Sequence, residues 1–381
     1  MANTLIIATT SYAGMGPYVA SIVNAFRKDD PVYFIFHDHK DDFYRKNVKV
    51  ELHDKSLFLK RADSHWNKLL DLLHTRPSQK QLNSLLNYCK KNDIAIVHWI
   101  NSPGNRYENQ YLEEHGIKVL GTVHDLHPHE AKCAPHRMLR FHILNKRNKE
   151  AMVRARYLVT NSRTQYKEMQ SLFPNKRLFF HDFPSLVTPI VAKGGVVPKE
   201  LQSQKRPYIL FFGRIEEYKG IALLYKAFTE SPEISDKYDL VIAGSGQIPF
   251  ERKSNEQQVT FINRYILDEE VRYLYEHAAC VVYPYISATQ SGVLSIAYYF
   301  GTPVLASDVD FFRSIIAPSG AGCLFKKSNV EDLREQLKYI LSHDNSEIIS
   351  KEKDYYKRYY ETAAIRKELL NIYENINKAS K

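Results

Sequence analysis

Cysteine is scarce in this chain of 381 residues, and the four cysteines lie far apart. Cys89, Cys133, Cys280 and Cys323 form no CxxC pair, so they indicate neither a disulfide framework nor a zinc site. Long apolar runs are also missing, and without a stretch of eighteen apolar residues no membrane-spanning helix is expected. The N-terminus lacks the basic and apolar regions of a secretion signal and instead indicates a β-strand. These absences favour a cytoplasmic protein.

The composition is that of a soluble globular protein, with 44% hydrophobic and 25% charged residues. The length fits two domains of common size. The net charge of +10 indicates an anionic partner, which is a nucleotide, a nucleic acid or a lipid headgroup. A basic surface that is merely solvated is the alternative.

Both halves of the chain alternate short apolar runs with helically spaced apolar residues, as in a parallel sheet covered by helices on both faces. We therefore predict an α/β fold of two Rossmann-like halves, each able to bind a ligand at the C-terminal ends of its strands. The stretch 187–207, rich in proline and glycine, is the expected linker between domains at 1–186 and 208–354. A final helix is expected at about 355–381. The expected strands are Leu5–Thr9, Val32–Phe36, Ile94–His98, Lys118–Val123, Tyr157–Thr160, Tyr208–Phe212, Leu240–Ala243, Val259–Phe261, Cys280–Tyr283 and Pro303–Ala306.

The strongest motif is FFGRIEEYKG, at the end of the strand expected at Tyr208–Phe212. Gly213 lets the backbone turn sharply and approach a ligand closely. Arg214 and Lys219 then present a forked and a point-like cation to one crevice, and a helix starting near Ile221 points its N-terminus there. This combination suits a diphosphate. The alternative is a strand–turn–helix whose charges are simply exposed.

Further loops follow apolar strands in the C-terminal half. The run TQSG stands at a helix start, where amide and hydroxyl groups can hold phosphate oxygens, although an ordinary N-cap at Ser291 is the alternative. IAGSGQ places Gly244 in a turn, which by itself is a weak signal. The segment after the next strand, Arg264–Ile266, stands where a nucleobase can lie.

The order of these motifs from about Pro207 to Ile316 resembles retaining glycosyltransferases of family four. The resemblance implies the GT-B fold, with two Rossmann-like domains facing a central cleft. The N-terminal domain would bind the acceptor, the C-terminal domain would bind the donor, and the final helix would pack back on the N-terminal domain. Arg214 and Lys219 would neutralise the donor diphosphate. The implied donor-binding residues are Gly213, Gly244, Arg264, Tyr265, Ile266, Thr289, Gln290, Ser291, Gly292 and Val293.

The sequence departs from that family at two positions. Its members carry two glutamates separated by seven residues around the last loop, and Ala288 and Ile296 occupy those positions here. The second glutamate helps to hold the donor ribose. The departure therefore puts the ribose contacts and the donor preference in question.

Two loops of the N-terminal half carry the remaining site candidates. The resemblance implies that the loop with Gly14, Met15 and Gly16 helps to orient the acceptor. It also places His124, with Asp125 beside it, near the donor sugar, where a histidine can donate to a hydroxyl or exchange a proton.

Three other interpretations of these loops stay open. The first loop partly fits a dinucleotide motif, and Asp38 follows the second strand as an NAD site requires. A metal site from His124, His127 and His129, with Glu130, is a second interpretation. A solvated loop without chemistry is the third.

The segment 131–167 holds ten lysine or arginine residues and one acid, Glu150, among apolar side chains. Such a stretch can lie on an anionic membrane surface, which would suit a lipid-linked acceptor. No nucleic-acid-binding module is recognised, so nucleic acid is not the expected partner. Solvated basic helices are the alternative.

The sequence thus predicts a glycosyltransferase that moves a hexosyl group from a UDP- or GDP-linked sugar to a hydroxyl of a glycan or polyprenyl-pyrophosphate-linked acceptor. Retention of configuration and a role in cell-surface polysaccharide synthesis at the inner face of the membrane are implied by the resemblance. No metal and no further cofactor are expected. A GT-B nucleotide-sugar epimerase, a non-catalytic binding relative and an NAD enzyme remain as alternatives.

Overall fold

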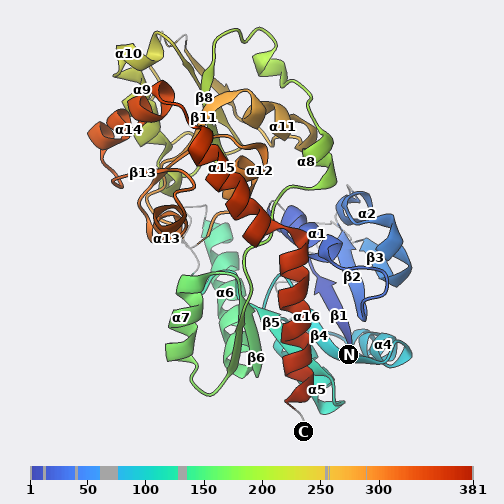
Figure 1. Cartoon of the computed structure of the whole chain (residues 1–381). Coiled ribbons are helices and arrows are strands. Elements are labelled where there is room, and N and C mark those ends of the chain that lie inside the picture. Colours follow the sequence, from blue (N-terminus) through green and yellow to red (C-terminus); the bar gives the residue numbers. More distant parts are fainter. Residues whose placement is uncertain are drawn as a thin grey trace. The chain divides into compact units, whose positions relative to one another are not determined.

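A computed structural model describes residues 2–11, 14–38, 42–60, 76–127, 135–253, 256, 258–288 and 290–379. The chain forms two compact units (Figure 1). The first unit comprises Met1–Pro184 and Thr362–Lys381, and the second comprises Ser185–Glu361. The expected boundaries at 186 and 355 therefore lie at 184 and 361.

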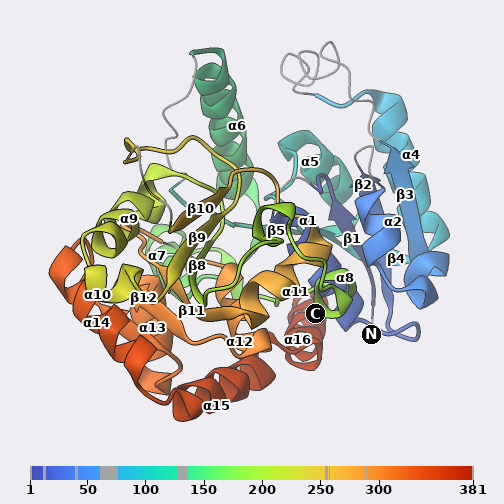
Figure 2. The same ribbon diagram turned by 90° about the horizontal axis from the view of Figure 1, so that it is seen from above.

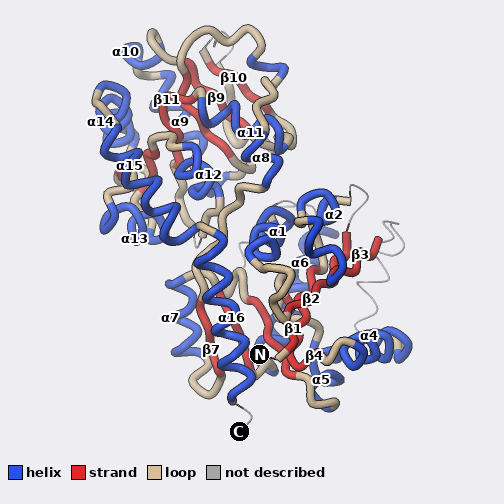
Figure 3. Tube along the Cα trace, turned by 45° about the vertical axis from the view of Figure 1, so that its right-hand side comes forward, coloured by secondary structure: helices blue, strands red, loops and turns tan. Residues whose placement is uncertain are grey.

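The first unit contains a parallel sheet in the order β3-β2-β1-β4-β5-β6-β7 within its described residues. Apolar runs in the strands lie between helices on both faces (Figure 3). The strands are β1 (Asn3–Ala8), β2 (Val32–Asp38), β3 (Ser56–Lys60), β4 (Ile94–Trp99), β5 (Lys118–Thr122), β6 (Tyr157–Thr160) and β7 (Arg177–Phe180). The helices are α1 (Met15–Ala25), α2 (Phe43–Asn47), η1 (Val50–Lys55), α4 (Gln79–Lys91), α5 (Arg106–Glu114), α6 (Pro135–Arg154), α7 (Arg163–Leu172) and α16 (Thr362–Lys378).

The second unit contains a parallel sheet in the order β10-β9-β8-β11-β12-β13, seen from above in Figure 2. Its strands are β8 (Tyr208–Phe212), β9 (Asp239–Ala243), β10 (Val259–Ile262), β11 (Ala278–Tyr283), β12 (Val304–Ser307) and β13 (Cys323–Phe325). Its helices are α8 (Pro189–Lys193), η2 (Lys199–Leu201), η3 (Glu217–Lys219), α9 (Ile221–Thr229), α10 (Pro232–Ser235), α11 (Asp268–Glu276), α12 (Val293–Phe300), α13 (Asp310–Ser319), α14 (Val330–Ser342), α15 (Ser346–Tyr355) and η4 (Tyr356–Tyr360).

Local sequence explains where several helices begin. The hydroxyl of Ser78 accepts a hydrogen bond from the Gln81 backbone amide, and the Oε1 atom of Gln81 accepts one from the Ser78 backbone amide, so α4 starts with a capping box. The side chain of Asn329 accepts from the Asp332 amide and caps α14. These contacts satisfy amide groups that the first helical turn leaves without a partner.

The linker predicted at 187–207 is not a linker. Pro189 occupies the first turn of α8, where proline is tolerated because that position needs no amide donor. Val191 and Leu201 are buried in the core of the second unit. Prolines that suggested a break therefore start a helix and shape a packed segment.

The C-terminal helix α16 belongs to the first unit and lies along α1 and β4. Arg366 pairs through two nitrogens with the buried carboxylate of Asp30. The Tyr373 hydroxyl lies 2.8 Å from Nδ1 of His98, and Lys118 donates to carbonyl groups at the end of the helix. The expected helix at 355–381 is interrupted at Glu361, whose extended backbone separates η4 from α16.

A buried carboxyl group lies under the second sheet. Glu352 on α15 is 0% exposed, and its Oε1 accepts a hydrogen bond from the Val304 amide at 2.9 Å. Burial raises the pKa of the Glu352 carboxyl well above its usual range, although the Val304 amide and Lys353 oppose the shift. The folded state therefore binds one proton more than the unfolded chain between the usual glutamate pKa and the raised one. Stability must fall as pH rises through that window.

We expect Glu352→Gln to unfold at a higher temperature than the parent at about pH 8 and at a similar temperature at about pH 5. The amide keeps an acceptor for Val304 but cannot ionise. Each kcal/mol of added stability moves Tm by about 2–4 °C in a domain of this size. Thermal unfolding across pH checks this, with the exposed Glu347→Gln on the same helix as control. Equal gains at both pH values would contradict it.

Candidate functional site

The second sheet has its topological switch point between β8 and β11, because β9 and β10 continue on one side and β12 and β13 on the other. Ligands of open parallel sheets bind at the carboxyl ends of the strands at such a point. The chain leaves β8 through the GRIEEYKG loop into α9, and leaves β11 through the SATQSG loop into α12. The two predicted phosphate-binding loops are therefore neighbours in space.

Close main-chain contacts explain two glycines of these loops. Gly244 has a φ of +150°, and a Cβ there would lie 1.8 Å from the Gly213 carbonyl oxygen. Gly220 has a φ of +68°, and a Cβ there would lie 1.8 Å from the carbonyl oxygen of Pro284. Only glycine fits such positions. The second contact locks the β8 loop against the residue that follows β11.

The two predicted cations lie in the same loop environment. The Arg214 guanidinium is more than half exposed, and its Nη1 lies 2.7 Å from Oε1 of Glu216. The Lys219 ammonium lies 3.8 Å from the ring centroid of Tyr285 and 4.9 Å from that of Tyr218. Burial lowers the pKa of Lys219 to about 8, and the Arg214 charge adds to the fall while Tyr218 and Glu216 oppose it. The Arg214 and Lys219 charges therefore lie near enough to affect each other within one loop.

The start of α12 forms the other side of this site. Gly292 precedes the helix, Gln290 and Val293 are partly buried, and the buried Ser291 hydroxyl lies 3.3 Å from that of Tyr285. Thr289 lies outside the described residues. The N-terminal ends of α9 and α12 thus both meet the switch point, where their amide groups and dipoles favour an anion.

The side chain of Arg264 is engaged within its own unit. Its guanidinium donates to both carboxylate oxygens of Glu200 and of Glu270, at 2.7 to 2.9 Å. These bonds raise the pKa of Arg264 and lower that of Glu200. They tie η2 and α11 to the end of β10. A nucleobase at this segment is therefore left with the main chain and with Tyr265, which is exposed, while Ile266 is buried.

The two positions that depart from the glutamate pattern are apolar in structure as well as in sequence. Ile296 is 4% exposed and packs in the core of the second unit, and Ala288 packs against that core. Neither supplies a carboxylate to a ribose.

In the first unit, the loops after β1 and β4 also meet at a switch point. The Asn101 side chain accepts from the Thr9 amide at 2.7 Å and lies 3.6 Å from the sulfur of Met15. A Cβ on Gly16 would lie 2.8 Å from the Ser11 carbonyl oxygen, whereas Gly14 has open space around it. Gly14, Met15 and Gly16 therefore lie at the edge of the first sheet where the strands have their carboxyl ends.

His124 follows β5 at the same edge. Its Nε2–H donates to the Ile100 carbonyl oxygen at 2.9 Å, and its ring meets Tyr18 edge-on with centroids 4.9 Å apart. Burial lowers the pKa of His124, so the ring is neutral at physiological pH. The neighbouring Asp125 is exposed. The structure thus anchors the predicted histidine through Nε2 and fixes its orientation.

The alternative sites of the first unit gain no support from the described geometry. His127 pairs with Glu168 at 2.7 Å, and His129 and Glu130 lie outside the described residues. No group of three metal-ligating side chains occurs in the described part of the chain. The Asp38 carboxylate accepts from the Tyr44 amide at 2.8 Å and so supports the start of α2, where an NAD site would need it for a ribose.

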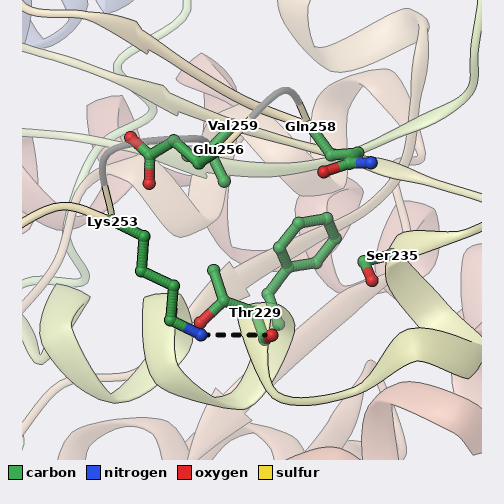
Figure 4. A pocket seen from close by; sticks show the side chains of 7 residues that line it. Thr229, Ser235, Lys253, Glu256, Gln258 and Val259 are labelled. Carbon is green, nitrogen blue, oxygen red and sulfur yellow. Dashed lines mark hydrogen bonds between the residues drawn. The ribbon is translucent and has the colours of Figure 1, made fainter.

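A hollow of about 260 Å³ opens at the other end of the second sheet (Figure 4). It lies between the last turn of α9 and the start of β10, and Lys253 donates across it to the Thr229 carbonyl oxygen at 3.5 Å. This is the amino-terminal edge of the strands. It is therefore remote from the loops that carry Arg214 and Lys219.

Comparison with known proteins finds a family match in the second unit. Residues 196–362 match the family model described as "Glycosyl transferases group 1". This part of the chain is therefore similar to the members of that family. All the predicted donor-site residues lie within the glycosyl transferases group 1 region, whereas Gly14, Met15, Gly16, His124 and Asp125 lie outside it.

One curated relative is a phosphatidyl-myo-inositol mannosyltransferase from Mycobacterium leprae, 25% identical over 175 residues. The alignment spans 44% of this chain and 46% of that relative, so it covers about half of each. No described helix combines the length and apolar character that a bilayer-spanning segment requires.

Solved structures resemble the whole chain. Sucrose-phosphate synthase from Thermosynechococcus elongatus has a TM-score of 0.69 at 17% identity, with both chains covered completely. Anabaena HepE in complex with UDP and glucose has a TM-score of 0.65 at 11% identity, covering 98% of this chain and 100% of that one. At such identities the likeness establishes the fold, which is GT-B, as the sequence predicted.

Two residues that shape these loops were not predicted. Asn101 joins the loops after β1 and β4, and Tyr285 lies under the Lys219 ammonium. Both follow the end of an apolar strand, which is the signal that could have singled them out.

Proposed function

We propose that this chain transfers a hexosyl group from a nucleotide diphosphate sugar to a hydroxyl of a glycan or lipid-linked glycan acceptor, with retention of configuration. The observation that carries the proposal is the pair of cations, Arg214 and Lys219, at a switch point that also receives the N-termini of α9 and α12. The complex of Anabaena HepE with UDP-glucose supports a UDP-linked donor.

The proposed chemistry is stabilisation of a leaving group. As the bond from the sugar to the diphosphate breaks, negative charge builds on the phosphate oxygens. Arg214, Lys219 and the amide groups of the two helix starts offer positive charge at that place, which lowers the barrier because it acts most strongly on the transition state. We propose that these groups supply the charge without a metal or another cofactor. The leaving phosphate then takes the proton of the acceptor hydroxyl.

We further propose a lipid-linked acceptor used in cell-surface polysaccharide synthesis at an anionic membrane face. The name of the mycobacterial relative supports a hexose as the transferred group and a lipid as the acceptor. On α6 of the first unit, Leu144 and Val153 are exposed among Lys146, Lys149 and Arg154. Apolar and basic side chains of this kind favour an anionic bilayer. Flotation with vesicles that contain phosphatidylglycerol, and none with phosphatidylcholine alone, would support the contact, and equal recovery from both would remove it.

A screen of nucleotide sugars by thermal unfolding tests the donor assignment, because a ligand that binds only the folded state raises Tm. We expect a UDP- or GDP-linked hexose to raise Tm by a few degrees, and calorimetry with UDP and GDP to give a matching affinity. Absence of binding by both nucleotides would sink the proposal.

A binding protein without transferase activity is the second candidate, and the observation that favours it is the buried Ile296 in place of a carboxylate. A nucleotide-sugar epimerase is a third candidate, and incubation of the protein with the nucleotide sugar alone distinguishes it from a transferase. An epimerase would convert the donor without an acceptor, whereas a transferase needs one for transfer.

We expect His124→Ala to reduce sugar transfer by at least about tenfold while UDP affinity stays within about twofold. The reason is that His124 lies at the carboxyl ends of the strands in the first unit, whereas Arg214 and Lys219 lie in the second unit. Steady-state transfer rates and UDP calorimetry on the same preparations check this. The control is His127→Ala, an exposed histidine of the same loop, which should leave both quantities unchanged. Loss of UDP binding with intact transfer would refute a role at the sugar.

A further inference from the structure

Tyr285 is the second residue after β11, next to Pro284, and is 0% exposed. The Lys219 ammonium lies 3.8 Å from the centroid of its ring, and the Tyr218 ring, set at 75° to it, lies 4.9 Å from the same ammonium. Aromatic faces attract a cation at such distances, most strongly where water is excluded. Lys219 is therefore held by two rings from two different loops.

The Tyr285 ring is itself fixed on several sides. Its hydroxyl lies 3.3 Å from the Ser291 hydroxyl, and the ring of Phe312 packs on it with a centroid separation of 5.1 Å. Its carbonyl oxygen accepts from the Ser307 hydroxyl at 2.6 Å. A side chain held in this way has one orientation, so it can impose that orientation on its neighbours.

Tyr285 also stands where the two phosphate-binding loops are joined. The Ile286 amide donates to the Tyr218 carbonyl oxygen at 2.8 Å, and Gly220 admits the Pro284 carbonyl oxygen where any Cβ would collide. One residue thus touches the cation of the β8 loop with its face and the start of the α12 turn with its hydroxyl.

We propose that Tyr285 is the positioning residue of the donor site, holding the Lys219 ammonium and the Ser291 turn in the arrangement that a nucleoside diphosphate needs. This inference rests on the function proposed above and adds to it a residue outside the predicted set. The ring face aligns the cation, and the hydroxyl aligns the turn before α12. Binding then requires little rearrangement, which favours affinity.

The test is calorimetric titration of UDP and GDP into the full chain and its variants, with the tighter nucleotide used throughout. Tyr285→Leu removes the ring face, and we expect affinity to fall about tenfold. Tyr285→Phe keeps the face and loses the hydroxyl, and we expect a loss of about threefold. The matched control is Tyr208→Leu, a buried tyrosine at the amino end of the same sheet whose hydroxyl donates to the Leu274 carbonyl oxygen. It should lose stability and keep nucleotide affinity.

A double-mutant cycle separates positioning from general packing. If Tyr285 acts through Lys219, Tyr285→Leu should cost less than about twofold in affinity when Lys219 is already methionine. Thermal unfolding identifies the variants that fold before they are titrated. If Tyr285→Leu does not fold, the nucleotide affinity of Tyr285→Phe provides the test.

A pH profile gives a second readout that packing alone would not move. The charged and titratable groups that face Lys219 are Arg214, Glu216, Tyr218 and Tyr285. The Tyr285 ring stabilises the ammonium form of Lys219, so its removal should lower the pKa of Lys219. Nucleotide affinity should therefore begin to fall at a lower pH in Tyr285→Leu than in the parent chain.

Three outcomes decide between the claims. Equal affinity of Tyr285→Leu and Tyr208→Leu would overturn the positioning role alone, provided that Lys219→Met binds weakly. A tenfold loss that persists in the Lys219→Met background would also overturn it. If the parent chain binds neither UDP nor GDP, the proposed function fails first, and the role of Tyr285 fails with it.

Discussion

Arg214→Ala should lower kcat/KM for sugar transfer by about 10²–10³-fold, which corresponds to about 2.7–4 kcal/mol of transition-state stabilisation. The guanidinium forms an ion pair with Glu216 and is more than half exposed, so a diphosphate can reach it. A forked cation that meets two phosphate oxygens at once contributes more than an exposed ion pair does. Transfer rates with the donor identified by the nucleotide screen provide the measurement.

Because Arg214 is exposed, its substitution should have little effect on the stability of the fold. An ion pair at the surface contributes about 0–1 kcal/mol to stability, so the variant should unfold at nearly the parent temperature. Arg313→Ala is the matched control, since Arg313 is exposed to a similar extent and pairs with Asp310 on α13. Unchanged transfer in Arg214→Ala would remove the assignment of this loop as the diphosphate site.

Lys219→Met should weaken UDP binding by about 10- to 100-fold and should also change its pH dependence. Burial lowers the pKa of Lys219 to about 8, so the ammonium form that attracts phosphate is lost as pH rises through that value. We therefore expect affinity in the parent chain to be highest well below pH 8 and to decline as pH rises through that value. In Lys219→Met, which carries no titratable group at this position, the affinity should be low and flat over the same range.

Calorimetry between about pH 6.5 and 9.5 checks both parts of this expectation. Lys226→Met, at the exposed far end of α9, should retain the parent affinity and the parent pH profile. A decline above pH 8 that survives in Lys219→Met would assign the titration to another group and would separate Lys219 from the phosphate.

Most of the strands that were predicted correctly are buried on both faces. Leu5–Ala8 and Tyr208–Leu210 are continuous apolar runs because parallel strands are covered by helices on both sides. β3, β7 and β13 were missed. Each lies at a sheet edge, where one side of the strand has no neighbour, and most of their residues are not fully buried. The apolar runs of these strands are only three residues long, at Leu57–Leu59, Leu178–Phe180 and Cys323–Phe325, and do not stand out from the surrounding sequence.

The arrangement of the candidate site was likewise predicted only in part. Gly213, Arg214, Lys219 and Gly220 lie within eight consecutive positions, so a turn between a strand and a helix was enough to bring them together. The role of Arg264 could not be inferred locally, because Glu200 stands 64 positions earlier in the chain. The packing of α8 on α11 likewise depends on residues far apart in sequence.

The sequence alone determined the α/β class, the two Rossmann-like halves and the cationic turn, because apolar periodicity and short motifs act over a few residues. Only the tertiary structure decided that β8 and β11 are neighbours, that Tyr285 therefore lies under Lys219, and that Arg264 is neutralised by two carboxylates. The physical reason is that strand order and side-chain packing join segments 64 to 71 positions apart. The free energy of those contacts depends on the whole core and leaves no local pattern in the sequence.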